Sequence, residues 1–231
     1  MREVENSGTA QLRRRAPFRA RLVVMVKQPV GGHVKTRLAR QAGMPRAINF
    51  YRHSTAAVLA RIGRDRRWQT LLSVAPDTAT GSAAWPSCLQ RMRQGGGDLA
   101  RRMQRIFDEL PPGPVIIVGS DIPGITAGRI AAAFRQLGGN DVVFGPASDG
   151  GYWLVGLKRR PRVPRIFGNV RWSTADALAD TRANVGDLRI ADAAMLDDVD
   201  ERADLERCGN GYGRRIPPPE RSRESACVHV H

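Results

Sequence analysis

The stretch Val115-Ile116-Ile117-Val118-Gly119-Ser120-Asp121-Ile122-Pro123-Gly124 decides the fold of this chain. Its four consecutive branched apolar residues have the length and β-propensity of a strand that is buried on both faces, as in a parallel sheet. In open α/β sheets, ligands bind at the carboxyl ends of the strands. Asp121 is therefore the leading candidate for a metal ligand. The alternative is that Ser120 and Asp121 only shape a turn or cap the helix predicted near Thr126.

Length and composition favour one domain with a phosphate-bearing ligand. The chain has 231 residues, of which 42% are hydrophobic, and this is enough for one well-buried core. Its formal net charge of +15 first suggests a nucleic-acid or anionic-membrane partner. Aromatic residues, which serve as stacking platforms in single-stranded nucleic-acid sites, make up only 6%. The charge therefore suits a phosphate-bearing small molecule as well as it suits RNA, and it is the motifs described below that make nucleic acid the less expected partner.

Cysteine usage and hydropathy predict a cytoplasmic protein. The three cysteines are far apart and form no C-x-x-C motif, which argues against a structural zinc site or a disulfide framework. No apolar run approaches the roughly 18 to 20 residues of a membrane span. A transmembrane segment is not expected, whereas peripheral membrane contact remains compatible with the sequence. The predicted organisation is an Arg-rich flexible extension over 1–20, one domain over 21–207 and a disordered tail over 208–231.

The elements before and after the central stretch alternate between strands and helices. Short apolar runs predict strands, and apolar residues at helical spacing, as in the stripe from Ile48 to Ile62, predict helices. A cap at Ser173-Thr174 is predicted to open a helix that runs to Ala183. Strands are expected near 22–26, 68–74, 87–93, 115–118, 141–144, 152–157 and 187–191, and helices near 45–63, 99–110, 130–137 and 174–183.

The loop after the first strand has the composition of a phosphate-binding loop. Pro29 and the paired glycines Gly31 and Gly32 forbid a continued strand, and a helix is predicted from Lys35 or Thr36. Backbone N–H groups at such a helix start attract anions, and Lys27, Lys35 and Arg37 would add positive charge. Lysine is rare in this chain, with three lysines against 34 arginines. The spacing matches neither a Walker P-loop nor a dinucleotide-binding motif, and an ordinary turn is the alternative.

Two further loops combine glycines with a carboxylate. Gln94-Gly95-Gly96-Gly97-Asp98 precedes a helix, so Asp98 is either its N-cap or part of a ligand site, and the glycines would let backbone approach a ligand. Asp149-Gly150-Gly151-Tyr152 lies between two predicted strands and is either a tight turn or a second acidic element of the site. Two carboxylates at one sheet edge would suit Mg²⁺ or Mn²⁺ holding a diphosphate.

Taken together, these motifs resemble those of the DUF2064 family, which is described as GT-A-type glycosyltransferases, some of them named for arsenosugar biosynthesis. The resemblance covers about residues 22–206. Gly31 replaces a second proline usual in the family, and Ala100-Arg101 replaces Gly-Glu. The residues that carry it are Lys27-x-Pro29-x-x-Gly32-x-Val34-Lys35-Thr36-Arg37-Leu38, Gln94-Gly-Gly-Gly-Asp98-Leu99, Gly119-Ser-Asp-x-Pro123, Gly145-Pro-Ala-x-Asp-Gly-Gly-Tyr152, Trp172-Ser-Thr174 and Asp198-Val-Asp200.

The resemblance implies a single-domain α/β/α sandwich of the nucleotide-diphospho-sugar transferase type, with a mostly parallel sheet. It implies an enzyme that moves a sugar from a nucleoside diphosphate sugar to a small-molecule or lipid acceptor with Mg²⁺ or Mn²⁺. Asp121 and Asp149 would be catalytic, with Asp121 on the metal; a role for Asp200 stays open. The other expected site residues are Lys27, Gly32, Lys35, Arg37, Gly97, Asp98 and Ser120 for the nucleotide, and Gly150, Gly151, Tyr152 and Trp172 for donor or acceptor.

Two alternatives remain open at this point. One is a nucleotidyltransferase of related fold, which would join a nucleoside monophosphate to a phosphorylated acceptor; the guanylyltransferases of phospholactate have similar Lys-Thr-Arg-Leu runs in their phosphate loops. The other is a catalytically idle nucleotide-binding or RNA-binding protein, which the basic charge favours. Trp172, an aromatic candidate for stacking on a base or sugar, is also compatible with a place in the core.

Overall fold

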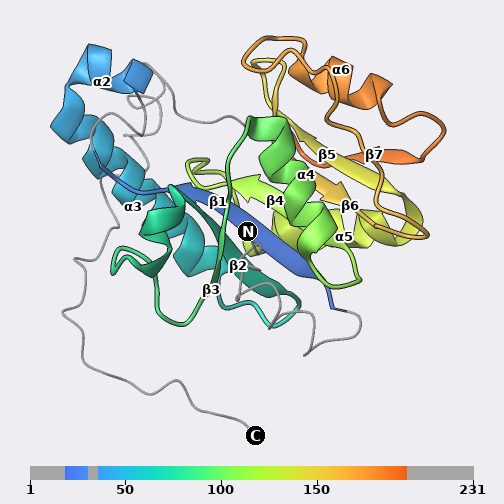
Figure 1. Ribbon diagram of the computed structural model, residues 1–231, viewed down its shortest axis with the longest axis horizontal. Coiled ribbons are helices and arrows are strands. Elements are labelled where there is room, and N and C mark those ends of the chain that lie inside the picture. Colours follow the sequence, from blue (N-terminus) through green and yellow to red (C-terminus); the bar gives the residue numbers. More distant parts are fainter. Residues whose placement is uncertain (1–18, 31–35, 197–231) are drawn as a thin grey trace, which may run out of the picture.

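The computed structural model describes residues 19–30 and 36–196 (Figure 1). The predicted tail over 208–231 and nearly all of the extension over 1–20 lie outside these residues. The described strands are β1 (Arg21–Lys27), β2 (Gln69–Ala75), β3 (Gln90–Arg93), β4 (Val115–Gly119), β5 (Val142–Pro146), β6 (Tyr152–Leu157) and β7 (Ile190–Asp192). The helices are α2 (Thr36–Ala42), α3 (Met44–Ile62), the short 3-10 helix η1 (Asp77–Gly81), α4 (Leu99–Glu109), α5 (Ala127–Gly139) and α6 (Ala177–Ala183).

The strands form one seven-stranded sheet in the order β3-β2-β1-β4-β6-β5-β7. Strand β6 runs antiparallel to β4 and β5, and every other pair of neighbours is parallel. The deciding stretch is β4, which lies at the centre with Val115 to Val118 buried at 3% exposure or less. The mostly parallel single-domain α/β fold is therefore confirmed.

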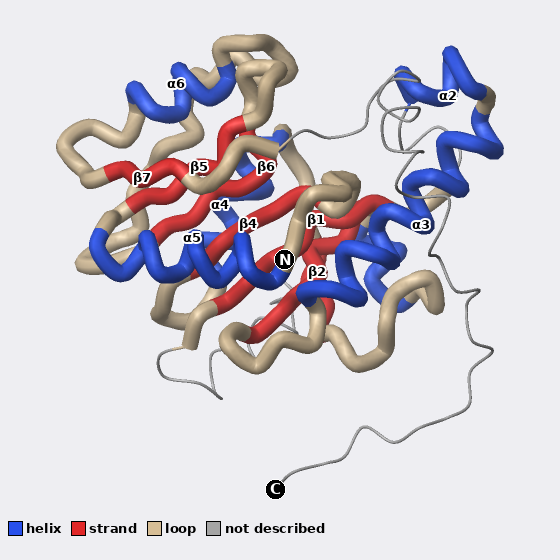
Figure 2. The backbone as a smooth tube through the Cα atoms, turned by 180° about the vertical axis from the view of Figure 1, so that it is seen from behind, coloured by secondary structure: helices blue, strands red, loops and turns tan. Residues whose placement is uncertain are grey.

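Helices cover both faces of the sheet, which explains why the central strands are apolar throughout. The core on one face unites α3 and α5, including Leu59 and Ile130, with the sheet. The core on the other face unites α4, including Phe107, with the sheet, and α6 contributes the partly buried Leu178. Figure 2 shows α3 and α5 from behind, on the side of the sheet away from α4.

The N-caps of α4 and α5 decide whether Asp98, Ser120 and Asp121 act as helix caps. Asp98 caps α4, because its Oδ1 accepts from the backbone N–H of Arg101 at 2.9 Å. Thr126 caps α5 in the same way through Arg129. The helix near Thr126 therefore has its own N-cap, so neither Ser120 nor Asp121 fills that position.

Two expectations are wrong. The helix expected from Ser173-Thr174 begins only at Ala177, because Ser173 has a positive φ of 62° and Thr174 Oγ1 instead accepts from the backbone N–H of Asp176 in a local turn. The helical spacing of Leu99, Met103, Ile106 and Leu110 predicts one buried face, but Leu99 is 42% exposed, because it is the first residue of α4.

Arginines serve as structural forks that bind backbone carbonyls. Arg21, with 0% exposure, donates to the carbonyls of Pro111 and Pro112, and Arg159 donates to those of Leu110, Pro111 and Gly113. Burial lowers the pKa of Arg159 to about 10, and the nearby charge of Arg21 lowers it further. Arg91 holds the loop near Trp85 in the same manner. Part of the excess of arginine is therefore used in hydrogen bonds within the fold and is not available to bind a partner.

Candidate functional site at the carboxyl edge of the sheet

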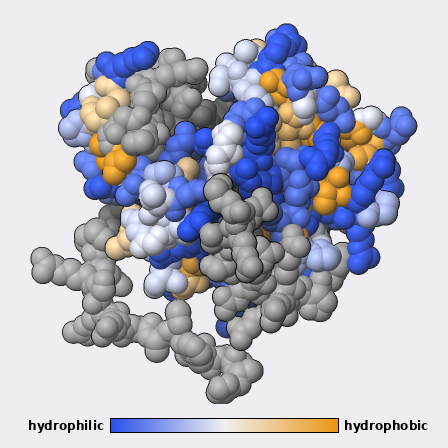
Figure 3. All heavy atoms as spheres, in the orientation of Figure 1, coloured by the Kyte–Doolittle hydropathy of each residue, from blue (hydrophilic) through white to orange (hydrophobic). Residues whose placement is uncertain are grey.

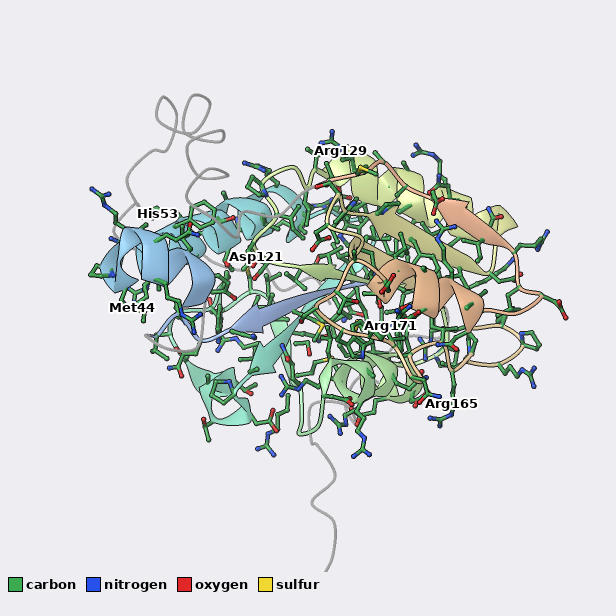
Figure 4. All side chains as sticks on the ribbon, turned by 90° about the horizontal axis from the view of Figure 1, so that it is seen from above. Met44, His53, Asp121, Arg129, Arg165 and Arg171 are labelled. Carbon is green, nitrogen blue, oxygen red and sulfur yellow. The ribbon has the colours of Figure 1, made fainter. Side chains whose placement is uncertain are left out.

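The predicted motifs that lie in the described residues meet at one edge. Strands β1, β2, β3, β4 and β5 run in the same direction, so the segments that follow them come together. Strand β6, which is antiparallel, begins at that edge with Tyr152. Figure 4 shows Asp121 in the middle of the molecule, between the arm that carries Met44 and His53 and the side that carries Arg171.

A cavity of about 470 Å³ opens at this edge, a size typical of small-molecule sites. Five predicted site residues line it, namely Lys27, Asp149, Gly151, Tyr152 and Trp172. Asp98 and Gly97 lie next to its wall, which includes Leu99. The rest of the lining consists of Met25, Gln94, Arg102, Met103, Ile117, Val118, Gly119, Ile122, Ala147, Trp153, Leu154, Val155, Ser173, Thr174 and Ala177.

Asp121 lies beside the cavity but is not among the residues that line it. It follows β4 and is partly buried, and one of its carboxylate oxygens lies 3.2 Å from the place where a Cβ on Gly119 would stand. Since Gly119 lines the cavity, the carboxylate is next to the wall rather than in it. Glycine at position 119 keeps that space open for the carboxylate.

A buried tyrosine joins the start of the phosphate loop to the Asp121 segment. The Tyr51 hydroxyl accepts from the backbone N–H of Lys27 at 2.7 Å and lies 3.0 Å from Ser120 Oγ. Desolvation raises the pKa of Tyr51, and the charge of Asp121 raises it further. Sequence reasoning placed Tyr51 in the core stripe of α3, and the stripe gave no sign that its hydroxyl meets two other strand ends. Through Tyr51, Ser120 is therefore linked to helix α3 and to the end of strand β1.

Tyr51→Phe is expected to destabilise the chain by about 1 to 3 kcal/mol, because the backbone N–H of Lys27 loses its buried acceptor. Tyr152→Phe is the matched control, since its hydroxyl has only a 3.5 Å contact with Thr181, and it should cost less than about 1 kcal/mol. Urea unfolding of the two variants measures the difference. Equal decreases in the free energy of unfolding of the two variants would mean that the hydrogen bonds of Tyr51 do not stabilise the fold more than the contact of Tyr152 does.

Hydrogen bonds to segments distant in the sequence hold the glycine-rich loop before α4, and the sequence gave no sign of these partners. The Gln94 amide donates to the carbonyls of Val26 and Ser73, and Asp77 accepts from the Gly95 N–H at 2.9 Å. Gly97 has a φ of +98°, so glycine is required there by backbone geometry. Gly96, where an added Cβ would meet nothing within 4 Å, leaves open space beside the loop.

The Asp149 loop is a tight turn of the β5–β6 hairpin and also a wall of the cavity. Asp149 Oδ1 accepts from the Gly151 N–H at 2.8 Å, and Gly150 has a φ of +83°. A Cβ on Gly150 would stand 2.0 Å from the carbonyl oxygen of Ala175. The hairpin tip therefore packs directly against the segment that precedes α6. The turn interpretation is confirmed, and the exposed carboxylate still faces the cavity.

Aromatic rings form one side of the cavity. Trp172 is partly buried and packs against Tyr152 and Phe167, with ring centroids 6.3 and 6.4 Å apart. Burial raises the pKa of Tyr152, so its phenol stays protonated. Trp172 belongs both to the core and to the cavity wall. Figure 3 shows apolar patches on the α6 side of an otherwise largely hydrophilic face.

An arginine fixes the segment that carries Trp172. Arg171 forms ion pairs with Asp176 at 2.7 Å and with Asp180 at 2.8 Å, and its backbone N–H also donates to Asp180. Hydrogen bonds from Arg171 lower the pKa of Asp180 from the ordinary 3.8 to about 2. This bridge ties the 171–176 segment, which supplies Ser173 and Thr174 to the cavity, to helix α6.

The Asp180 carboxylate is expected to titrate near pH 2, and Arg171→Gln should return it towards 3.8. Because the folded pKa lies below the unfolded one, the stabilisation is complete above about pH 4 and is lost as pH falls through about 2. Carboxyl ¹³C NMR of the side chain follows this titration. A wild-type midpoint near 3.8 would show that the bridge does not hold Asp180 in solution.

Several expected site residues lie outside the described part of the chain. Gly32, Lys35 and Asp200 belong to the undescribed ranges 31–35 and 197–231, and for Arg37 only the helical backbone is described. Their predicted roles stay predictions. In their place the structure brings Arg102 into the cavity wall, where its guanidinium also donates to the Gly97 carbonyl at 2.8 Å. Arg102 lies three residues into the amphipathic α4 and gave no signal in the sequence.

The donor atoms near the cavity suit a hard divalent cation. Asp121 and Asp149 supply carboxylate oxygens, and the cavity lining has no histidine or cysteine. Within residues 19–30 and 36–196, no group of three or more His, Cys, Asp or Glu side chains could hold a metal on its own. Mg²⁺ sites on nucleotides commonly use one or two carboxylates and complete their coordination with phosphate and water. The arrangement therefore fits a metal that is shared with a diphosphate.

The fold defines a class, the nucleotide-diphospho-sugar transferase type of α/β protein. A family model described as "Uncharacterized protein conserved in bacteria (DUF2064)" matches residues 58–174, which is half of the chain. The chain belongs to this family. A comparison with curated proteins gives no match.

Solved structures support the class. A crystal structure from Desulfovibrio desulfuricans G20, provisionally described as a nucleotide-diphospho-sugar transferase, is 29% identical with a TM-score of 0.73, covering 85% of this chain and 90% of that one. A 4-diphosphocytidyl-2C-methyl-D-erythritol synthase from Anaerococcus prevotii DSM 20548 is 10% identical with a TM-score of 0.56, covering 86% and 99%. The second likeness concerns the fold alone. Among the described residues, no helix is long and apolar enough to cross a membrane.

Proposed function

We propose that this protein transfers a sugar from a nucleoside diphosphate sugar to an acceptor, with Mg²⁺ or Mn²⁺ at Asp121. The observation that carries the proposal is the cavity at the carboxyl edge, which has the Asp149 carboxylate and the cations Lys27 and Arg102 in its lining and the Asp121 carboxylate next to its wall at Gly119. Negative charge grows on a departing diphosphate, and such positively charged groups stabilise it. The relative from Desulfovibrio desulfuricans supports the same class of substrate.

Each side of the cavity has a proposed role. The backbone of the loop ending in Gly97 and Asp98, beside the open space at Gly96, would receive the nucleoside. Lys27 and Arg102 would hold the diphosphate, and Ser120 would keep the Asp121 segment in register through Tyr51. Lys35, Arg37 and Gly32 stay predicted phosphate contacts.

The sugar and the acceptor would occupy the α6 side of the cavity. The ring of Trp172 offers a flat apolar face, and the hydroxyls of Ser173 and Thr174 and the exposed Asp149 carboxylate offer polar partners. Gly150, Gly151 and Tyr152 would shape this subsite through the hairpin turn. A bound metal would supply Lewis acidity to the leaving diphosphate. The remaining groups bind, orient and exclude water.

The decisive experiment is a thermal-shift screen of nucleoside triphosphates and nucleoside diphosphate sugars with and without Mn²⁺, because a ligand that binds only the folded state raises apparent stability. A positive donor is then incubated with candidate acceptors, and the released nucleotide is identified. Release of a nucleoside diphosphate supports sugar transfer. Release of pyrophosphate from a nucleoside triphosphate would support the rival nucleotidyl transfer instead, and no nucleotide response at all would contradict both.

A further inference from the structure

A second cavity, larger than the first, lies beside helix α3. It has a volume of about 690 Å³ and no lining residue in common with the cavity at the carboxyl edge. Its walls are α3, the segment 84–89 and Pro29. Leu59, Trp85 and Leu89 in these walls belong to the core on the α3 and α5 face. We call this cavity the α3 groove; its size is that of a small-molecule site.

The α3 groove is apolar along its length and cationic at both ends. Arg52, Ala56 and Ala60 follow one another at intervals of four residues and form one stripe on α3, and Arg64 lies just beyond the C-terminal end of that helix. The two arginines lie at opposite ends of the groove, because Arg52 is in α3 and Arg64 follows its C-terminal end. The two alanines are exposed, and Leu59 and Trp85, with 5% and 4% of their surface exposed, form the floor of the groove between the charges.

The electrostatic surroundings favour an anion. No aspartate or glutamate lines the groove, and from residue 6 to residue 64 the sequence has no acidic residue. Helices α2 and α3 lie wholly within that range. Positive charge that is not balanced locally attracts anionic ligands and disfavours cationic ones. A neutral hydrocarbon would use only the floor of the groove, so the arginines point to a ligand with a charged end.

We propose that the α3 groove binds a single-chain amphiphile with an anionic head group, a phosphate or a carboxylate. The chain would lie on Leu59, Trp85 and Leu89, and the head group would meet Arg52. The Arg52 end is also the polar end, because the nearly buried Tyr51 and Thr55 line the groove there.

The Arg52 end of the groove adjoins the carboxyl edge of the sheet. Tyr51 lines the groove, and its hydroxyl contacts Ser120 Oγ and the Lys27 N–H. A head group at Arg52 therefore stands beside the segment that carries Asp121. This assigns the acceptor of the proposed transfer to the amphiphiles, and that assignment, unlike the binding itself, rests on the proposed function.

Calorimetric titration with dodecyl phosphate below its critical micelle concentration tests the binding. Ala60→Phe fills the groove from an exposed position and should weaken binding at least tenfold. Asn49→Phe, exposed on α3 outside the groove, should stay within twofold. Each methylene between octyl and dodecyl phosphate should tighten binding by about fourfold, the affinity equivalent of burying one such group.

The arginines are tested separately. Arg52→Gln should weaken dodecyl phosphate about tenfold and leave neutral dodecyl maltoside unchanged, whereas Arg46→Gln, exposed on α3 outside the groove, should change neither. Equal affinity in wild type and Ala60→Phe, or no dependence on chain length, would overturn the proposal. Binding of poly(U) that Arg46→Gln and Arg52→Gln weaken alike, without any binding of dodecyl phosphate, would assign this face to nucleic acid and also overturn it.

Two further measurements distinguish a membrane lipid from a free amphiphile and separate the groove proposal from the proposed sugar transfer. Co-sedimentation with phosphatidic acid vesicles that Ala60→Phe abolishes would identify a membrane lipid as the source, and its absence beside dodecyl phosphate binding would identify a free amphiphile. Amphiphile binding without any response to nucleotide sugars would support the groove proposal and contradict the proposed transferase function. A nucleotide-sugar response without amphiphile binding does the reverse.

Discussion

Asp121→Asn is expected to lower turnover at least about a hundredfold and to abolish the stabilisation that Mn²⁺ and a nucleotide give together, while the free protein melts almost as before. Asparagine keeps the size of aspartate and serves turns and caps comparably, so a structural role would survive the change. A neutral amide is a poor substitute for a carboxylate on a hard divalent cation. Activity assays and thermal shifts with and without Mn²⁺ read out the two effects.

Asp65→Asn is the matched control for that variant. Asp65 pairs with Arg67 just before β2, at the edge of the sheet opposite Asp121, so its change should leave activity intact. Removal of metal with a chelator should lower wild-type activity to the level of Asp121→Asn. If Asp121→Asn unfolds, or keeps both turnover and metal dependence, Asp121 is structural and the site lies elsewhere.

Gly150→Ala should destabilise the chain by about 2 to 4 kcal/mol, because it combines a strained positive φ with overpacking. The added Cβ would stand 2.0 Å from the Ala175 carbonyl oxygen, which is backbone and cannot turn aside as a side chain would. The hairpin and the segment before α6 would have to separate, and the donor or acceptor side of the cavity would open with them. We therefore expect a lower free energy of unfolding, measured with denaturant, and a weaker affinity for nucleotide sugars.

Gly168→Ala provides the comparison, since an added Cβ there meets nothing within 4 Å and the backbone has no positive φ. It should change stability by less than about 0.5 kcal/mol, as ordinary surface substitutions do. A Gly150→Ala variant as stable as Gly168→Ala would mean that the hairpin tip does not pack on Ala175 in solution.

The sequence was informative wherever the deciding interactions are local. The strand predicted at 115–118 follows from a run of a few residues, and β4 confirms it. The cap at Asp98 was one of two interpretations of a short spacing, and the hydrogen bond from Arg101 confirms it. The Asp149 turn was one of two interpretations, and the hairpin confirms it.

Long-range partners explain what the sequence could not reveal. The hydroxyl of Tyr51 meets groups 24 and 69 residues away, and nothing in the α3 stripe marks it apart from an ordinary core aromatic. Arg102 and Gln94 reach the cavity only because strands and α4 converge there. The cap at Ser173-Thr174 failed because Arg171 and Asp180, which are nine residues apart, fix that segment in a different turn.

The arginines that donate to backbone carbonyls help to determine how the stability of the protein depends on ionic strength. A guanidinium that binds a neutral carbonyl, as Arg159 does at Leu110, is not an ion pair, so dissolved salt has no opposing carboxylate to screen. The net charge of +15, by contrast, makes the chain repel itself, and salt weakens that repulsion. The melting temperature should therefore rise as sodium chloride is added, although the protein is rich in charged residues.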